Sequence, residues 1–435
     1  MLHARMDFAK PTLAAMAFAL LPLIAQADDQ TQPGAGNAAA VQLAKASPLV
    51  QSAYALLVRN ARKIRSPALR TETLDILTNE KTCLKHRANL TEAAKDAIVG
   101  QLKSAGLVDI ADDATFPGGL KTGVFPAVLH DGSACPSPPQ PFYAAPGSSF
   151  GSHHSQPGGL AVHEIMNDMD DLALAANYAR VYGSTNRDGL PVVRMTQTGH
   201  RSDLGIDNEI LLAAPIWHDF AKTMVFQWNA DGSEFKELNF GGNGKTDACG
   251  PAGTAGDSRT GGHHIIGLAE AMARGLAPDF VITQASAHAP PTLGNEYKVV
   301  NWLRAAAIIA QIDPVAKGFL TQDAAGCFRL PPVRRVGEFD LLGQHQTNLL
   351  VEYVLHNLSD ADFNFTVPAA GDVDLLLKKL APEYGYDATQ PNYNLKFRNP
   401  VLSYLSAERL YILYSNRGLD AVRGEIKKLK TLKLL

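Results

Sequence analysis

Apolar residues recur at helical spacing over most of this 435-residue chain. In the stretch 90–107, for example, Ala94, Ile98 and Leu102 fall on one stripe of a helix. Thr91 stands just before that stripe, where a helix N-cap is expected. Similar patterns fill most of the chain, so we expect a mainly α fold.

One β-hairpin is predicted to interrupt the helices. The segments 224–229 and 234–240 alternate apolar and polar residues on either side of Asp231-Gly232. An Asp-Gly centre between two such segments is typical of a tight hairpin turn. The Gly-rich stretch 241–262 follows, and we expect it to be a mobile loop that can act as a lid.

Proline and glycine divide the chain into successive regions. The stretch 109–149 is rich in both residues and reads as an extended connection. After residue 314 the pattern is again helical, most clearly over 347–357 and 403–415. The predicted regions are a signal peptide (1–27), a disordered leader (28–38), an N-terminal helical region (39–108), a Pro/Gly-rich linker (109–149), a central domain (150–313) and a C-terminal helical region (314–435).

The N-terminus has the pattern of an export signal. Basic residues precede an apolar run from Leu13 to Ala25, and Ala25-Gln26-Ala27 supplies small residues where a signal peptidase reads them. The run is shorter than the roughly 20 residues of a bilayer-spanning helix, and no later stretch reaches that length. We therefore expect cleavage before Asp28 and a periplasmic or secreted protein with no transmembrane segment in its mature chain.

The charge balance bears on the kind of binding partner, and the number of cysteines bears on disulfide formation. The 40 Lys and Arg residues are balanced by 43 Asp and Glu residues, so no positive field exists to hold a long polyanion. We expect no obligate nucleic-acid partner and favour a small-molecule site. The even number of cysteines is compatible with disulfides in an oxidising compartment, and three pairings are possible. The cysteines are Cys83, Cys135, Cys249 and Cys327.

Histidine is concentrated in the middle of the chain. Most of the 13 histidines lie between residues 153 and 288, namely His153, His154, His163, His200, His218, His263, His264 and His288. One histidine alone is most often a packed or capped residue, so the clustering is the signal.

The pair His218-Asp219 is the strongest single candidate. It lies in the apolar segment 210–222, where an ionised carboxylate beside an imidazole is costly unless something pairs with it. A bound cation would provide that pairing. Imidazole nitrogen and carboxylate oxygen suit iron, manganese, cobalt or zinc. A second pair, His130-Asp131, lies in a turn without an apolar wall, and we interpret it as a solvated loop.

Four ordered motifs carry a family resemblance. They are His153-His154 with Gly158-Gly159 and His163, then His218-Asp219 with Lys222, then Gly262-His263 with Gly267, then Ala287-His288. Together they resemble the HD-domain metal-dependent phosphohydrolase superfamily over about residues 150–313. The resemblance implies an HD-type helical core there, with the hairpin as a small insertion.

The resemblance also implies roles for these residues. His163, His218 and Asp219 would bind one metal, and His263 and His288 a second; His263 is preferred to His264 because Gly267 follows it by four residues, as in the family. Lys222 would hold a substrate phosphate. His153 or His154 would contact the leaving oxygen or phosphate, or would cap the turn before Gly158-Gly159.

The family closes its metal site with a further aspartate. In this chain Ala307 stands where that aspartate is first expected, and Asp313 is the nearest candidate. Two helical turns of about 5.4 Å each separate these positions, so they are not interchangeable without a change of register. Either the alignment with the family slips, or Asn301 or Asp313 serves instead, or the site is altered.

The resulting hypothesis is hydrolysis of a small phosphoester, such as a nucleotide or a related phosphomonoester or diester, by metal-activated water. One or two divalent ions of manganese, iron, zinc or cobalt would be bound. The expected catalytic residues are Asp219, Lys222, His153 and His154. Two alternatives stay open, a di-iron oxygenase of the HD type and a catalytically inactive protein of the same fold that binds a metal or ligand.

Overall fold

The computed structural model describes residues 33–189, 204–250, 258–292, 294–331 and 350–435. In these ranges the chain is mainly helical, with two short antiparallel strand pairs, which confirms the predicted fold class. The predicted signal peptide and residues 28–32 of the leader lie outside the described residues, and the last two leader residues, Asn37 and Ala38, belong to helix α1.

The N-terminal helices form where the periodicity predicts them. Helix α4 carries the expected apolar stripe, and the Thr91 side chain accepts a hydrogen bond from the backbone N–H of Ala94 at 3.2 Å. Ser47 caps α2 in the same way, with Pro48 at the first helical position. The helices of this region are α1 (Asn37–Ala46), α2 (Pro48–Ala61), α3 (Pro67–Thr78) and α4 (Glu92–Ser104).

The Pro- and Gly-rich stretch 109–149 contains short helices that pack against the rest of the molecule. Several of its apolar side chains, among them Leu120, Val124 and Phe142, are buried in the main hydrophobic core. The short helices are α5 (Asp112–Thr115), α6 (Gly119–Val124) and the 3₁₀ turn Phe142–Ala144.

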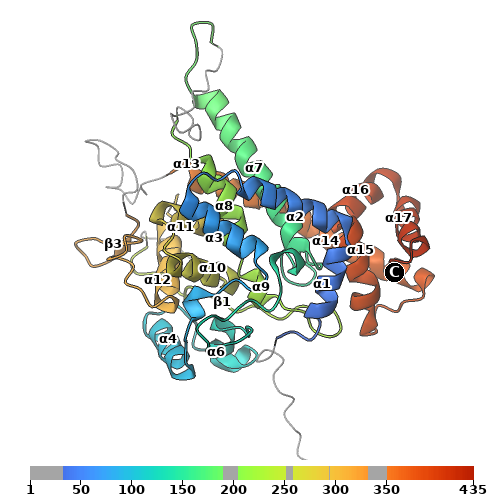
Figure 1. Ribbon diagram of the computed structural model, residues 1–435, viewed down its shortest axis with the longest axis horizontal. Helices are drawn as coiled ribbons and strands as arrows, with labels where there is room; N and C mark the ends of the chain where they lie inside the picture. Colours follow the sequence, from blue (N-terminus) through green and yellow to red (C-terminus); the bar gives the residue numbers. More distant parts are fainter. Residues whose placement is uncertain (1–32, 190–203, 251–257, 293, 332–349) are drawn as a thin grey trace, which may run out of the picture.

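Helix α8 (Asn208–His218) lies at the centre of the core. Every residue from Ile210 to His218 is buried, which is typical of a helix surrounded on all sides. It contacts helices of both the N-terminal and the central parts of the chain (Figure 1). The surrounding helices include α7 (Gly159–Tyr182), α10 (Gly262–Ala273), α11 (Pro278–Ala285) and α13 (Val351–Ser359), and α12 (Glu296–Ile309) packs against α10.

The predicted hairpin is only partly present. The turn at Asp231-Gly232 forms and is closed by a single bridge between Trp228 and Glu234, while Met224 belongs to helix α9 (Lys222–Val225). Residues 224–228 are all buried, so this segment has no solvent-facing side on which a regular strand would alternate.

The strands that do form pair over longer distances. Strand β1 (Asn239–Phe240) pairs with β2 (Thr260–Gly261), at the two ends of the Gly-rich stretch. A second pair, β3 (Thr321–Gln322) and β4 (Phe328–Arg329), was not expected from the sequence. Part of the predicted lid, residues 251–257, lies outside the described residues.

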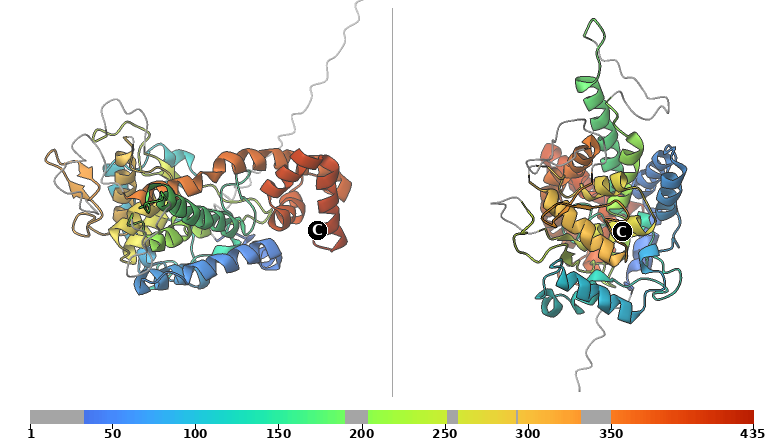
Figure 2. Two further views of the ribbon diagram at one scale, coloured as in Figure 1. Left: turned by 90° about the horizontal axis from the view of Figure 1, so that it is seen from above. Right: turned by 90° about the vertical axis from the view of Figure 1, so that its left-hand side faces the viewer.

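The C-terminal helices have a hydrophobic core of their own and lie at one end of the molecule (Figure 2). The predicted helix over 403–415 is broken at Ser406, which has a φ of +57° and caps the next helix through its side chain. The helix predicted from 347 begins at Val351, and residues 347–349 lie outside the described ranges. The helices of this end are α14 (Phe363–Leu380), α15 (Asn399–Leu405), α16 (Ala407–Arg417) and α17 (Leu419–Thr431).

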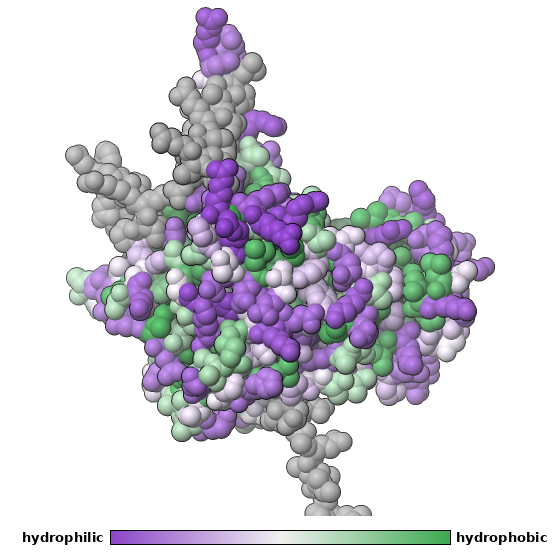
Figure 3. All heavy atoms as spheres, viewed as in Figure 1, coloured by the Kyte–Doolittle hydropathy of each residue, from purple (hydrophilic) through white to green (hydrophobic). Residues whose placement is uncertain are grey.

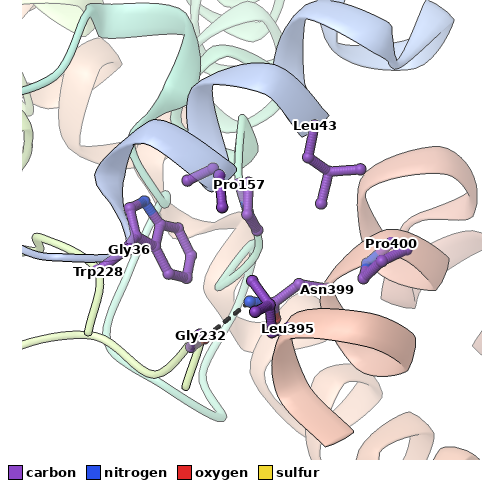
Figure 4. Close-up of a pocket in the computed structure, with 10 residues that line it drawn as sticks. Gly36, Leu43, Pro157, Trp228, Gly232, Leu395, Asn399 and Pro400 are labelled. Carbon is purple, nitrogen blue, oxygen red and sulfur yellow. Dashed lines mark hydrogen bonds between the residues drawn. The ribbon is translucent and has the colours of Figure 1, made fainter. Parts of the chain in front are cut away.

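The N- and C-terminal helices meet at a small pocket (Figure 4). Leu43 of α1, Pro400 of α15 and the ring of Trp228 line it, and Asn399 donates a hydrogen bond to the Gly232 carbonyl at 2.7 Å. Its volume of about 120 Å³ is well below the roughly 300–1,000 Å³ of typical ligand pockets. We interpret it as a packing junction.

Two disulfides tie the structure together. Cys83 pairs with Cys135 and Cys249 pairs with Cys327, which selects one of the three possible pairings.

On the face shown in Figure 3, hydrophilic side chains predominate over the central helices, and apolar ones gather over the C-terminal helices on the right. None of the helices in the described ranges is long and apolar enough to cross a bilayer.

Candidate metal centre

The pair His218-Asp219 is held at the end of α8 by close packing. His218 is the last residue of the helix, and Asp219 is its C-cap. Gln284 donates a hydrogen bond to the Trp217 carbonyl at 3.1 Å. A Cβ on Gly267 of α10 would lie 3.2 Å from that same carbonyl oxygen, so a glycine lets α10 approach closely.

The paired histidines are brought to the centre by the two glycines that follow them. Gly158 has a φ of +83°, and a Cβ on Gly159 would lie 1.7 Å from the His154 carbonyl oxygen. Only glycine therefore allows this loop to fold against the start of α7. The fold brings the His153 ring to 4.8 Å from the His163 ring, between centroids.

A first cluster forms around the Asp219 carboxylate. The Nε2 atom of His163 lies 3.4 Å from Asp219 Oδ2, and the Nε2 atom of His218 lies 3.4 Å from Asp219 Oδ1. All three residues are almost completely buried. The structure thus brings together the three residues predicted to bind one metal.

Asp360 completes this cluster from a distant part of the chain. Its Oδ1 atom lies 3.2 Å from His163 Nε2 and 3.6 Å from His218 Nε2. Asn167, one turn after His163 in α7, donates its side-chain amide to the same oxygen at 3.2 Å. Asp360 follows α13 directly, in the 3₁₀ turn Asp360–Asp362. Sequence reasoning, which looked for a further acid near residue 307, did not identify Asp360.

The structure does not bring the earlier candidates for this role to the centre. Asp313 accepts backbone hydrogen bonds from Val315 and Ala316 in an exposed turn beyond α12. Asn301 donates its side-chain amide to Asp247 at 2.6 Å, and Ala307 is buried in the hydrophobic core. Asn301 and Ala307 of α12, and Asp313 in the turn after it, therefore contact residues away from the centre.

A second cluster shares Asp219 with the first. His263 Nε2 lies 3.3 Å from Asp219 Oδ1, and Asp219, His263 and His288 each offer a ligand atom within 4.8 Å of the other two. His264 is directed elsewhere, with Nε2 3.1 Å from the Ala285 carbonyl and its ring stacked on that of His288.

Lys222 is buried beside the same carboxylate. Its ammonium group contacts Asp219 Oδ2 and the Gly147 carbonyl. Burial alone would lower the pKa of Lys222, but the carboxylates of Asp219 and Glu164 overcome this and raise it. Lys222 is therefore a permanent positive charge next to the clusters.

Burial and charge set the protonation of the cluster. Burial would raise the pKa of Asp219, but His218 and Lys222 hold it well below its usual value. For His163, burial is the largest effect and lowers its pKa to about 4. At neutral pH these shifts give an ionised Asp219 and a neutral His163, the forms that bind metals. For His218, burial would lower the pKa, but Asp219 and Asp360 raise it.

Many buried polar atoms here have no hydrogen-bond partner among the described residues. They are His163 Nδ1, His218 Nδ1 and Nε2, Asp219 Oδ1, His263 Nε2 and both carboxylate oxygens of Glu164. Such unpaired groups are costly inside a protein unless something satisfies them. These buried His, Asp and Glu groups could hold a metal ion.

Comparison with family models, curated proteins and solved structures gives no match to this chain. The interpretation of the centre therefore rests on its own geometry, and the HD-type likeness remains a prediction.

Several functional candidates were not found from the sequence. Besides Asp360, Glu164 lies within the first cluster, and Asp171 pairs with His356 at 3.0 Å between Oδ2 and Nδ1. The His356 ring is 5.0 Å from that of His218, between centroids. Asp171 lies two turns after His163, a spacing that could have indicated a shared helix face. Asp360 gave no such local signal.

The second His-Asp pair in the chain behaves differently. His130 is exposed, but Asp131 pairs with Arg87 at 2.9 Å and with Lys95 at 2.6 Å. The loop is thus solvated on its histidine side and held by ion pairs on its aspartate side, and it stands apart from both clusters.

Proposed function

We propose that the protein is a metal-dependent hydrolase of small phosphoesters. The observation that carries the proposal is the convergence of four buried side chains, in which each imidazole of His163 and His218 lies 3.2–3.6 Å from the carboxylates of Asp219 and Asp360. Two imidazoles and two carboxylates form a mixed N/O donor set, which suits manganese, iron, cobalt or zinc. The carboxylate of Asp360 also argues against the inactive alternative, which depended on the lack of a closing acid.

A divalent ion held by such a donor set would polarise a bound phosphate and lower the pKa of a bound water. Asp219 lies between both clusters and would hold one or two ions. Lys222 contributes a fixed positive charge beside Asp219, which would stabilise the negative charge of a phosphoryl transition state. His153 lies next to His163 and could pass a proton to the leaving oxygen.

The expected substrates are small. The balanced charge of the chain offers no extended basic surface for a polymer, which favours nucleotides or related phosphomonoesters and diesters. The two disulfides support the predicted export to an oxidising compartment, periplasmic or extracellular.

The decisive experiment combines metal analysis with a substrate screen. The mature protein would be purified, its metal content measured, and phosphomonoesters and diesters tested with manganese, zinc, iron and magnesium. We expect one or two ions per chain and metal-dependent phosphate release. Bound metal without hydrolysis of any phosphoester would contradict the proposal, and iron with oxygen uptake would favour the oxygenase alternative.

Matched variants locate the activity. His218→Ala and Asp219→Ala remove a ligand of the first cluster, and we expect both to lose metal retention and hydrolysis. His130→Ala and Asp313→Asn alter a histidine and an aspartate outside the clusters and should retain both. Full metal content and activity in His218→Ala would overturn the assignment.

A further inference from the structure

The histidines of the centre share an arrangement that the sequence did not indicate. In three of them Nε2 faces Asp219 or Asp360, while Nδ1 faces a second carboxylate. These second pairs are His163 Nδ1 with Asp362 Oδ1 at 3.9 Å, His218 Nδ1 with Glu164 Oε2 of the first cluster at 3.8 Å, and His263 Nδ1 with Glu237 Oε1.

The pair of Glu237 and His263 has the tightest geometry of the three. Glu237 Oε1 contacts the ring Nδ1 of His263 and also accepts a hydrogen bond from its backbone N–H at 2.6 Å. The ring is thereby held from two sides. Its other nitrogen, Nε2, is 3.3 Å from Asp219 and has no hydrogen-bond partner among the described residues.

The small sheet explains how these two residues meet. Strand β1 begins two residues after Glu237, and strand β2 ends two residues before His263, with Asn239 opposite Gly261. A Cβ on Gly261 would lie 2.7 Å from the His263 ring and 2.8 Å from Glu237 Oε2. A side chain at this position would force the pair apart.

We propose that Glu237 is a positioning residue that orients His263 as a metal ligand. Glu237 holds the ring at Nδ1 and at the backbone N–H, which directs Nε2 at Asp219, as carboxylates behind metal-bound histidines do. It also distinguishes His263 from His264, whose Nε2 lies against the Ala285 carbonyl. Glu237 thus selects the histidine that serves the second cluster. This inference rests on the metal centre proposed above and does not depend on phosphoester hydrolysis.

The test is metal binding by the full mature chain, measured with zinc alone and manganese alone in competition with a chelator. The wild type is expected to bind two ions. Glu237→Gln should weaken the second ion by 10- to 100-fold and leave the first nearly unchanged, because carboxylates behind metal-bound histidines contribute about that much. Glu237→Ala, which removes the acceptor completely, should have the larger effect. Lys236→Gln, at the exposed neighbouring residue, should bind as the wild type does.

A purely structural role predicts a different result. In that case the metal-free Glu237→Gln variant would unfold at a lower temperature while its affinity for both ions stayed native, and this would overturn the proposal. Binding of a single ion by the wild type, unchanged in Glu237→Gln, would overturn it as well. Two ions with no hydrolysis would contradict the proposed function alone, and the effect of Glu237 could still be measured.

Gly261→Ala gives an independent check, because it leaves both side chains present and separates them. We expect this variant to weaken the second ion as Glu237→Gln does. Native affinity in both Gly261→Ala and Glu237→Ala would exclude a positioning role.

Discussion

At the scale of single residues, the centre depends on which atoms of each side chain face inward. Asp219 offers its two oxygens to different histidines, and Asp360 faces His163 and His218 with one oxygen. The cost of burying these acids is offset by the charges around them. Single substitutions should therefore have large and specific effects.

Asp360→Asn should weaken binding of the first metal at least tenfold, because it replaces an anionic ligand by a neutral one. Chelator competition with zinc would measure this. Asp313→Asn, the matched change in an exposed turn, should have native affinity. Equal affinities in the two variants would remove Asp360 from the ligand set.

A second residue-scale prediction concerns pH. Glu234 is buried, and burial is the main cause that raises its pKa to about 8. The folded state therefore holds a proton on Glu234 at pH values where the unfolded chain has released it, so this group's contribution to stability falls as pH rises from about 5 to 8.

Glu234→Gln cannot ionise and should flatten that fall. The free energy of unfolding of Glu234→Gln, measured by urea denaturation at several pH values, should decline less between pH 5 and 8 than that of the wild type. The difference between the two declines should be on the order of 3 kcal/mol. Parallel curves for the two proteins would contradict the assignment.

At the scale of elements, the C-terminal helices hold the loop that carries the paired histidines. Arg398, buried just before α15, donates to the Ser155 carbonyl at 3.1 Å and to its hydroxyl at 2.9 Å. Ser403 of α15 donates to the Pro157 carbonyl at 2.8 Å. His154 Nε2 lies 3.6 Å from Glu408 Oε1 of α16. The separate core of this end is thus joined to the centre by polar contacts.

Arg398→Met should destabilise the protein by about 2–4 kcal/mol, because it removes the guanidinium that donates to the buried carbonyl and hydroxyl of Ser155. Chemical denaturation would measure the loss. Arg409→Met removes an exposed pair with Glu425 and should cost less than about 1 kcal/mol. Similar losses in both variants would argue against a specific role for Arg398.

At the scale of the whole molecule, the candidate ligands come from four segments that are far apart in the chain. These segments are α7, the end of α8, α10 and the turn after α13. A cation can bind at this centre only when all of these elements are assembled. Its binding free energy therefore contributes to folding.

Removal of metal should lower the unfolding temperature. At a metal concentration 100-fold above Kd, one site stabilises the folded state by about 2.7 kcal/mol. Calorimetry with and without excess chelator would measure the shift. Asp360→Asn should show a smaller shift than the wild type, and an unfolding temperature that does not respond to chelator would contradict a metal centre.

The sequence by itself determined the features that depend on neighbouring residues. Periodicity and the Thr91 cap indicated α4, and the apolar surroundings of His218-Asp219 marked the pair as needing a partner charge. The clustering of histidines indicated where the centre lies. These inferences succeed because helix formation and local charge burial depend on residues a few positions apart.

Only the tertiary structure decided which distant residues complete the centre. Asp360 follows His163 by nearly 200 positions, and the packing of α13 against α7 brings them together. Glu237 meets His263 only because β1 pairs with β2. Ala307 and Asp313 looked closer along the chain, but the register of α12 directs one into the core and leaves the other beyond the helix end. Contacts of this kind depend on packing between elements, which spacing along the sequence does not encode.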